Sequence, residues 1–245
     1  MIVEEIYFVI RVVFSMTDYG YIERNFKELS AELEGIAEKV GTRVPKLVCV
    51  TKSGTDEELL ALAKAGALAI GENRPGELKR RGELLAEASL KPELHQIGTL
   101  QSNKAKLVCD KAALIHSLDS LSLAKEIDKQ GKKLGRAIPV LIEINSAEEP
   151  QKSGVLPTEA ERFLNEISAF NSIAVTGLMT MGPAVSDPEE LRKYFRLTKE
   201  LFDKLNTRYG FGNDPILSMG MSDSYKVAIE EGSTLVRVGR RLFIK

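Results

Sequence analysis

The chain lacks tryptophan and holds only two cysteines and two histidines among its 245 residues. His95 and His116 are too few for a histidine-rich metal site, and no zinc-type ligand spacing is present. Cys49 and Cys109 lie in apolar stretches and do not form a CxxC pair. We therefore expect no metal, and two buried thiols in a reducing cytosol.

An excess of either charge is also absent. The chain has 34 Lys and Arg against 35 Asp and Glu, so its net charge is −1. No basic surplus points to nucleic acid or to an acidic membrane surface. Apolar residues make up 43 % and charged residues 28 %, a balance that excludes wholesale disorder. The composition predicts a globular, cytoplasmic protein.

The first 15 residues have an apolar middle, but the run is too short to span a bilayer and an arginine interrupts it. A secretory signal would open with positive charge, whereas this segment opens with Glu4 and Glu5. Three interpretations stay open: Met16 is the true start, the segment is a genuine extension, or it is a targeting segment. We treat residues 1–15 as an uncertain N-terminal extension and residues 16–245 as one domain.

Short apolar runs alternate with helical patterns along that domain. The apolar runs lie at 47–50, 67–70, 94–97, 113–115, 139–144, 173–178, 216–219 and 235–238. The helical patterns lie at 21–40, 56–65, 75–88, 102–109, 120–134, 158–170, 188–208 and 223–231. Eight strands and eight helices within this length predict a single (β/α)8 TIM barrel. An open doubly wound sheet would also alternate, but no GxGxxG follows the first strand.

In such a barrel, chemistry takes place at the carboxyl ends of the strands. Lys52 directly follows the first run, so its amine can enter the barrel mouth, where partial desolvation would free its lone pair for a Schiff base. Taken alone, Lys52 could equally be a solvated lysine that opens a loop. Asn73 follows the second strand, and His95 begins the segment HQIGTLQSNK, which either contributes to a site or merely caps the next helix. His116 either faces the lumen or is a structural histidine.

The loops after the last two strands are rich in glycine, serine and arginine. One runs from Ser218 to Asp223 and opens a helix, and the other reads Arg237-Val238-Gly239-Arg240. Small residues let the backbone approach a ligand closely, and N–H groups at a helix start favour an anion. Barrels often bind a phosphate in these two loops, so we expect a phosphate site here.

A Schiff-base lysine opposite a phosphate site describes an aldehyde that carries a phosphate, and pyridoxal 5′-phosphate (PLP) fits that description. Arg237 shares one strand face with Gly239 and could reach the pyridine nitrogen. A cation there would keep that nitrogen unprotonated and weaken the electron sink. A sugar-phosphate aldehyde bound by a Schiff-base aldolase stays as an alternative.

Eight motifs follow in order, each at a strand end: VCVTK (48–52), IGEN (70–73), HQIGTLQSNK (95–104), IHSLDS (115–120), the loop from Asn145 to KSGV (152–155), GLMTM (177–181), LSMGMSDSYKVAI (217–229) and GSTLVRVGRRLF (232–243). From about residue 20 onwards, the chain thereby resembles the PLP-binding barrels called PLP homeostasis proteins, or YggS/PROSC-type proteins. The resemblance implies a fold similar to the N-terminal barrel of bacterial alanine racemase. The first 15 residues match nothing in the pattern, and the family usually continues a few residues beyond the final Phe.

Carried over by position, the resemblance implies that Lys52 holds PLP as a Schiff base. It also implies that Ser222 and the backbone of Gly239 and Arg240 hold the phosphate, with Ser218 nearby.

The same resemblance implies that Arg237 faces the pyridine nitrogen and that Asn73 and His95 line the ring pocket. The role it implies is intracellular PLP (vitamin B6) and amino-acid homeostasis, with PLP-dependent apo-enzymes as candidate recipients.

A racemase needs one base on each face of the cofactor–substrate plane, and Lys52 can serve only one face. In alanine racemase the opposing tyrosine comes from the second domain of a partner subunit, whereas this chain ends five residues after Arg240. Tyr225 lies just past the phosphate loop and stays a candidate for the second base. We expect a monomeric PLP carrier without efficient turnover, and a weak amino-acid racemase is the alternative.

Overall fold

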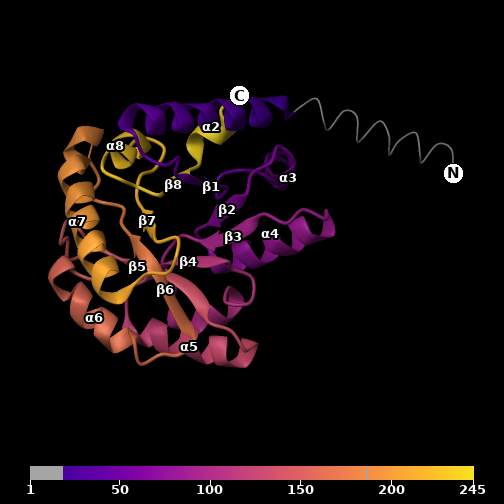
Figure 1. Cartoon of the computed structure of the whole chain (residues 1–245). Helices are drawn as coiled ribbons and strands as arrows, with labels where there is room; N and C mark the ends of the chain where they lie inside the picture. Colours follow the sequence, from indigo (N-terminus) through magenta and orange to yellow (C-terminus); the bar gives the residue numbers. More distant parts are fainter. Residues whose placement is uncertain (1–18, 186) are drawn as a thin grey trace.

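A closed barrel of eight parallel strands lies at the centre of the molecule, and helices surround it (Figure 1). The computed structural model describes residues 19–185 and 187–245, so the expected extension 1–15 lies outside the described residues. The strands are β1 (Lys46–Val50), β2 (Ala69–Glu72), β3 (Glu93–Gln96), β4 (Leu114–Leu118), β5 (Ile138–Glu143), β6 (Ile173–Met179), β7 (Ile216–Ser218) and β8 (Leu235–Val238). Each strand pairs with the next and β8 pairs with β1, which confirms the predicted (β/α)8 barrel.

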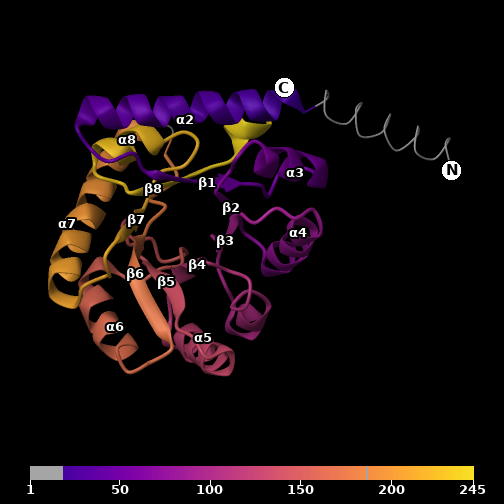
Figure 2. The ribbon, with the colours of Figure 1, turned by 45° about the vertical axis from the view of Figure 1, so that its right-hand side comes forward.

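Seven α-helices cover the outside of the barrel in the described part of the chain. They are α2 (Gly20–Val40), α3 (Asp56–Lys64), α4 (Pro75–Glu87), α5 (Leu121–Leu134), α6 (Ala160–Ile167), α7 (Arg192–Tyr209) and α8 (Tyr225–Glu230). The helix α2 precedes β1 and packs against α3, α8 and the C-terminal 3-10 turn η4 (Arg240–Phe243), as Figure 2 shows. It thereby closes the helical ring over the seam where β8 meets β1.

The expected helix at 102–109 differs in the structure, where it is the 3-10 helix η1 (Ser102–Leu107). Nucleating an α-helix costs more than one short turn returns, so a six-residue connection favours the tighter i→i+3 pattern. Two further 3-10 turns, η2 (Pro157–Glu159) and η3 (Pro188–Leu191), start the expected helices that continue as α6 and α7. Each of these turns has proline at its first position, where the missing N–H has no helical partner to lose.

Local sequence fixes where several helices begin and end. The Thr55 hydroxyl accepts from the Glu58 N–H while the Glu58 carboxylate accepts from the Thr55 N–H, a capping box that starts α3. Ser120 caps α5 more simply, because its hydroxyl accepts from the Leu123 N–H. Gly135 ends that helix in the left-handed conformation, which a residue without Cβ adopts freely.

The barrel lumen has its own apolar layer, separate from the two larger clusters under the helices. It is built from Val48, Ala69, Leu114, Leu141, Met179 and Leu235, which come from six different strands. Because side chains alternate along a strand, the next inward position lies two residues further toward the mouth. Glu143 on β5 and Arg237 on β8 occupy that position. Two charged side chains therefore lie directly above the apolar layer, at the floor of the barrel mouth.

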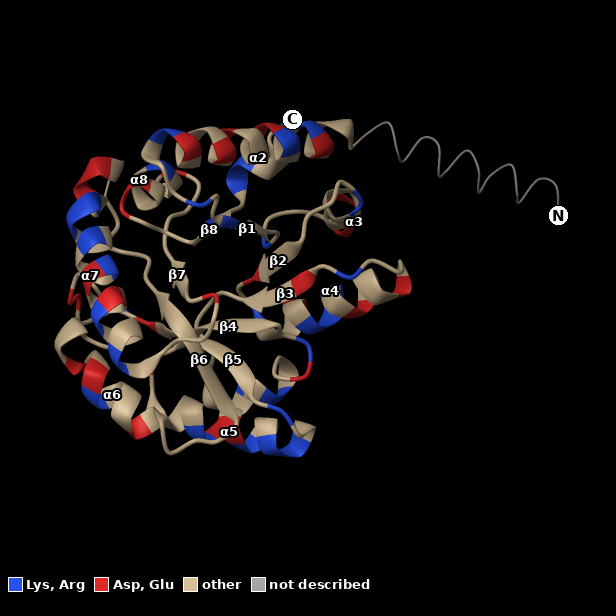
Figure 3. Cartoon of the chain, viewed as in Figure 1, with Lys and Arg blue, Asp and Glu red and all other residues tan. Residues whose placement is uncertain are grey.

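The outer surface carries both signs of charge, interspersed along the helices (Figure 3). None of the helices that the structure describes combines the length and apolar content needed to cross a bilayer. Cys49 and Cys109 are buried and not disulfide-bonded, as expected. Burial raises the pKa of both thiols to about 12, which leaves them unreactive at neutral pH.

Candidate functional site

A cavity of about 780 Å³ opens at the carboxyl ends of the strands, a size typical of small-molecule sites. Six of the eight predicted site residues line it: Lys52, Asn73, Ser222, Arg237, Gly239 and Arg240. They belong to the segments that follow β1, β2 and β7 and to the end of β8, so tertiary structure gathers residues almost 190 positions apart in the chain. An apolar wall that includes Met181, Val185 and Met221 completes the cavity.

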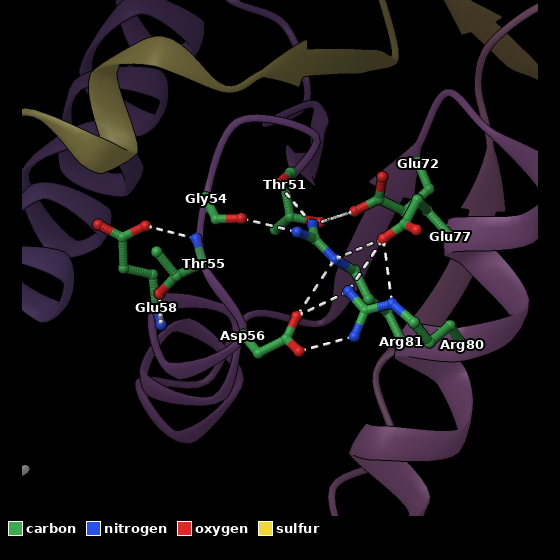
Figure 4. A network of polar contacts seen from close by, with 9 residues as sticks. All are labelled: Thr51, Gly54, Thr55, Asp56, Glu58, Glu72, Glu77, Arg80 and Arg81. Carbon is green, nitrogen blue, oxygen red and sulfur yellow. Dashed lines mark hydrogen bonds and ion pairs between the residues drawn. The ribbon is translucent and has the colours of Figure 1, made fainter.

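Lys52 lies in a turn that Arg81 of α4 holds in place. Arg81 is only 6 % exposed, and it donates to the carbonyl oxygens of Thr51 (2.5 Å) and Gly54 (2.6 Å). Its guanidinium also pairs with the Glu72 carboxylate at 2.5 Å, and the same carboxylate oxygen accepts from the Thr51 hydroxyl. Figure 4 shows Arg81 between this turn and the end of β2. A buried ion pair therefore fixes the backbone on both sides of Lys52.

A second set of ion pairs, more exposed to solvent, joins α3 to α4. Arg80 donates to both carboxylate oxygens of Asp56 at 2.6 and 2.8 Å, and to Glu77 at 2.9 Å (Figure 4). The bidentate pair ties the first residue of α3 to α4. These contacts brace the clamp formed by Arg81 from the solvent side.

Arg237 is held firmly at the floor of the cavity. It is 4 % exposed, and it donates to the carbonyl oxygens of Ser218 (3.0 Å) and Thr180 (3.1 Å) and to the Ser218 hydroxyl (2.5 Å). Burial lowers the pKa of Arg237 to about 10, and the nearby Glu143 opposes this change. Arg237 therefore stays a cation at neutral pH, in a fixed position.

Glu143 is a site residue that the sequence analysis missed. Glu143 is 4 % exposed and lines the cavity, and its carboxylate oxygen Oε2 has no hydrogen-bond partner among the described residues. Burial and the charge of Asp119 raise its pKa to about 7, although Arg237 favours the ionised form. The available signal was a carboxylate within the apolar run PVLIEI (139–144). An unsatisfied buried oxygen facing a cavity suits a ligand that supplies a hydrogen-bond donor.

The two glycine- and serine-containing loops meet at one edge of the cavity. The Ser222 hydroxyl accepts from the Gly239 N–H at 3.3 Å, and Arg240 pairs with Asp223. A Cβ on Gly239 would lie 2.9 Å from the Val50 carbonyl oxygen, so only glycine fits without shifting backbone. A hydroxyl, close-approaching backbone and a guanidinium are suitable groups for holding a phosphate.

Two predicted site residues, His95 and Ser218, do not line this cavity. Both lie one layer deeper in the lumen, and His116 lies between them. At the carboxyl end of β3, the inward position at the mouth belongs to Ile97, which directly follows the strand and lies two residues beyond His95. The expectation that His95 lines the ring pocket therefore differs from its position in the structure, whereas Asn73 does line the cavity.

Tyr225, the candidate second base, lies outside the cavity. It is 2 % exposed and packs in the core under α2, where its hydroxyl contacts Arg241. Burial raises its pKa to about 12, and its Glu32 hydrogen bond adds to this effect. Its position under α2 excludes it from acting directly on a ligand at the mouth.

Fold and site together define a class of protein: a (β/α)8 barrel with a lysine, an arginine and two small-residue loops around one mouth cavity. The family model for the alanine racemase N-terminal domain matches residues 24–244. The crystal structure of alanine racemase from Corynebacterium glutamicum gives a TM-score of 0.69 at 19 % identity. That match covers 92 % of this chain and 60 % of the racemase chain, and it shows a likeness of fold alone.

Relatives of higher sequence identity show which family within this class the chain belongs to. The pyridoxal phosphate homeostasis protein of Aquifex aeolicus is 40 % identical over 203 residues, which cover 83 % of this chain and 88 % of the relative. The structure of PipY from Synechococcus elongatus, with PLP bound, gives a TM-score of 0.79 at 26 % identity and covers 91 % of this chain and 100 % of PipY. The chain belongs to the family of pyridoxal phosphate homeostasis proteins.

Proposed function

We propose that this protein binds PLP as a Schiff base on Lys52 and serves intracellular PLP (vitamin B6) and amino-acid homeostasis without efficient turnover. The observation that carries the proposal is the convergence of Lys52, Arg237 and the Ser222–Gly239 pair on one cavity. The relatives named for PLP homeostasis and the PLP held by PipY support it. Such a protein would carry or buffer the cofactor rather than consume it.

Different residues of the cavity bind different parts of PLP. PLP supplies an aldehyde and an electron sink when bound. The Lys52 amine, placed by the clamped turn, is the nucleophile for that aldehyde. Ser222 and the backbone around Gly239 bind the phosphate together with Arg240.

The floor of the cavity sets the orientation of the ring. Arg237 presents a fixed guanidinium to the pyridine nitrogen, and Asn73 lines the ring pocket. His95 and Ser218 contribute from below rather than by direct contact. The unsatisfied oxygen of Glu143 is available to a donor on the ligand.

A reduction experiment tests the assignment of Lys52. The purified protein, loaded with PLP, should absorb in the near-visible, and borohydride followed by peptide mass mapping should mark Lys52. Lys52→Arg should lose the absorption band, whereas Lys79→Arg, at an exposed position on α4, should keep it. A protein that stays colourless with added PLP, or a label on another lysine, would refute the proposal.

The side chains that line the cavity favour binding over racemisation. No tyrosine lines the cavity among residues 19–185 and 187–245, so Lys52 has no tyrosine opposite it. We therefore propose a non-enzymatic role and keep a weak amino-acid racemase as the second candidate, because Lys52 alone can still move a proton on one face.

We further propose that the protein is cytoplasmic and monomeric, and that PLP-dependent apo-enzymes receive its cofactor. The balanced surface charge and the buried thiols at Cys49 and Cys109 support a reducing compartment and argue against a nucleic-acid partner. Residues 16–245 would form its one domain, and residues 1–15 an N-terminal extension.

A further inference from the structure

The two histidines of the chain lie inside the barrel, where they form one hydrogen-bonded line with three other residues. His95 Nε2 lies 3.3 Å from Oε2 of Glu93, and His95 Nδ1 lies 2.9 Å from His116 Nε2. His116 Nδ1 in turn lies 3.1 Å from the Ser218 hydroxyl, which accepts from Arg237 at 2.5 Å. The line therefore crosses the lumen from the first residue of β3 to the floor of the mouth cavity.

The chemistry of its ends fixes the direction of every hydrogen bond. Arg237 can only donate, so the Ser218 oxygen accepts from it and the Ser218 proton goes to Nδ1 of His116. Each neutral ring then carries its proton on Nε2: His116 donates to His95, and His95 donates to Glu93. A guanidinium at one end and a carboxylate at the other both favour this one arrangement.

The reverse direction is unfavourable on two counts. It would leave the buried Ser218 proton without an acceptor among the described residues, which costs free energy. It would also require His95 to carry protons on both nitrogens, one for His116 and one for Glu93. Burial, His95 and Arg237 lower the pKa of His116 well below its usual range, so this ring stays neutral. The hydrogen bond from His95 lowers the pKa of Glu93, which keeps that end anionic.

We propose that His116 and His95 are positioning residues that hold the Arg237 guanidinium in place through the Ser218 hydroxyl, with Glu93 anchoring the far end of the line. Arg237 is the fixed cation on the cavity floor, so a looser line lets it move away from the ligand. Only this last effect, on PLP, rests on the proposed function. The line itself is a property of the protein without ligand.

Nitrogen NMR of the ligand-free protein tests the line directly, because a chain with two histidines labelled with ¹⁵N gives two ring systems. His95→Gln assigns the remaining signals to His116. Both rings should show a proton on Nε2 and a bare Nδ1 at neutral pH. Ser218→Ala should shift the His116 Nδ1 signal toward that of a nitrogen without a donor. A proton on Nδ1 of His116, or a doubly protonated ring, would overturn the proposal.

Glu93→Ala tests whether the far end of the line acts on the site. The Glu93 side chain is 65 % exposed and does not line the mouth cavity, so water can replace the lost carboxylate at His95 Nε2 and the denaturation midpoint should fall only slightly. PLP affinity should fall by about tenfold, the equivalent of one hydrogen bond to a charged group, and the absorption band should shift. Glu93→Gln retains an acceptor oxygen and should restore much of the affinity.

Glu87→Ala is the matched control, since it removes an exposed carboxylate at the end of α4. It should leave PLP affinity and the absorption band unchanged. Equal affinities and spectra for Glu93→Ala and Glu87→Ala would refute the positioning role. If the unaltered protein takes up no PLP, the proposed function fails, and the NMR measurement still decides whether the line exists.

Discussion

At the scale of single residues, the environment decides the chemistry of the site. Glu143 would be an ordinary carboxylate in water, but burial beside Asp119 raises its pKa to about 7. Arg237 loses hydration as well, yet it keeps its charge because a guanidinium starts from a much higher pKa. The floor of the cavity therefore combines a permanent cation with a group that titrates near neutral pH.

The raised pKa of Glu143 predicts a pH dependence of stability. The folded protein binds a proton at Glu143 that the unfolded chain releases between about pH 4.5 and 7, so this group's contribution is complete below 4.5 and is lost as the pH rises through 7. Glu143→Gln should avoid that loss. Its free energy of unfolding relative to the unaltered protein should therefore rise by about 3 kcal/mol across this range.

Urea unfolding at both ends of the pH range measures the effect. Glu149→Gln, at a more exposed carboxylate in the loop after β5, is the control and should show no comparable change. A pH-independent difference between Glu143→Gln and the unaltered protein would mean that folding does not raise the pKa of Glu143.

At the scale of elements, most of the architecture could be predicted, because alternating apolar runs and amphipathic stretches are local patterns. The connection at 102–109 was the exception, since its length and its place between two strands decide the 3-10 form. The sequence predicted where the turn around Lys52 lies, but not that another residue holds this turn in place. Its clamp, Arg81, lies 29 residues further along in a helix whose sequence pattern shows only which face is apolar.

Arg81→Met should destabilise the protein by about 3–5 kcal/mol, because it leaves the Glu72 carboxylate buried without its partner. It should also weaken PLP binding, since the carbonyl groups around Lys52 lose their donor. Arg80→Met removes a mostly exposed pair and should cost no more than about 1 kcal/mol. Chemical denaturation of both variants makes the comparison, and similar losses would show that the clamp is not the stabilising contact.

At the scale of the whole molecule, barrel closure brings the two ends of the chain's domain together. β8 pairs with β1, and this contact places the Arg237–Arg240 segment beside the Lys52 turn. The same packing holds Tyr225 in the core beneath α2. Tyr225 is therefore kept away from the mouth cavity, although it lies just past the phosphate loop in the sequence. The fold thus places Lys52 at the mouth, and no tyrosine of the described residues lines the cavity with it.

That arrangement predicts slow racemisation. The PLP-loaded protein should convert L-alanine to D-alanine at a rate close to that of free PLP, because a proton removed on one face has no tyrosine to replace it on the other. Chiral chromatography over time measures the conversion, with Lys52→Arg as the control. Rapid turnover that Lys52→Arg abolishes would favour the racemase alternative.

The sequence by itself determined the barrel, the place of Lys52 after the first strand and the two loops suited to a phosphate, because these depend on periodicity and on residue types at strand ends. Only the tertiary structure decided which polar side chains meet in the lumen. His116 and Ser218 are 102 residues apart, and the facing direction of each strand residue is set when the barrel closes. The position of His95 below the mouth, the unsatisfied oxygen of Glu143 and the clamp on Lys52 all follow from that closure.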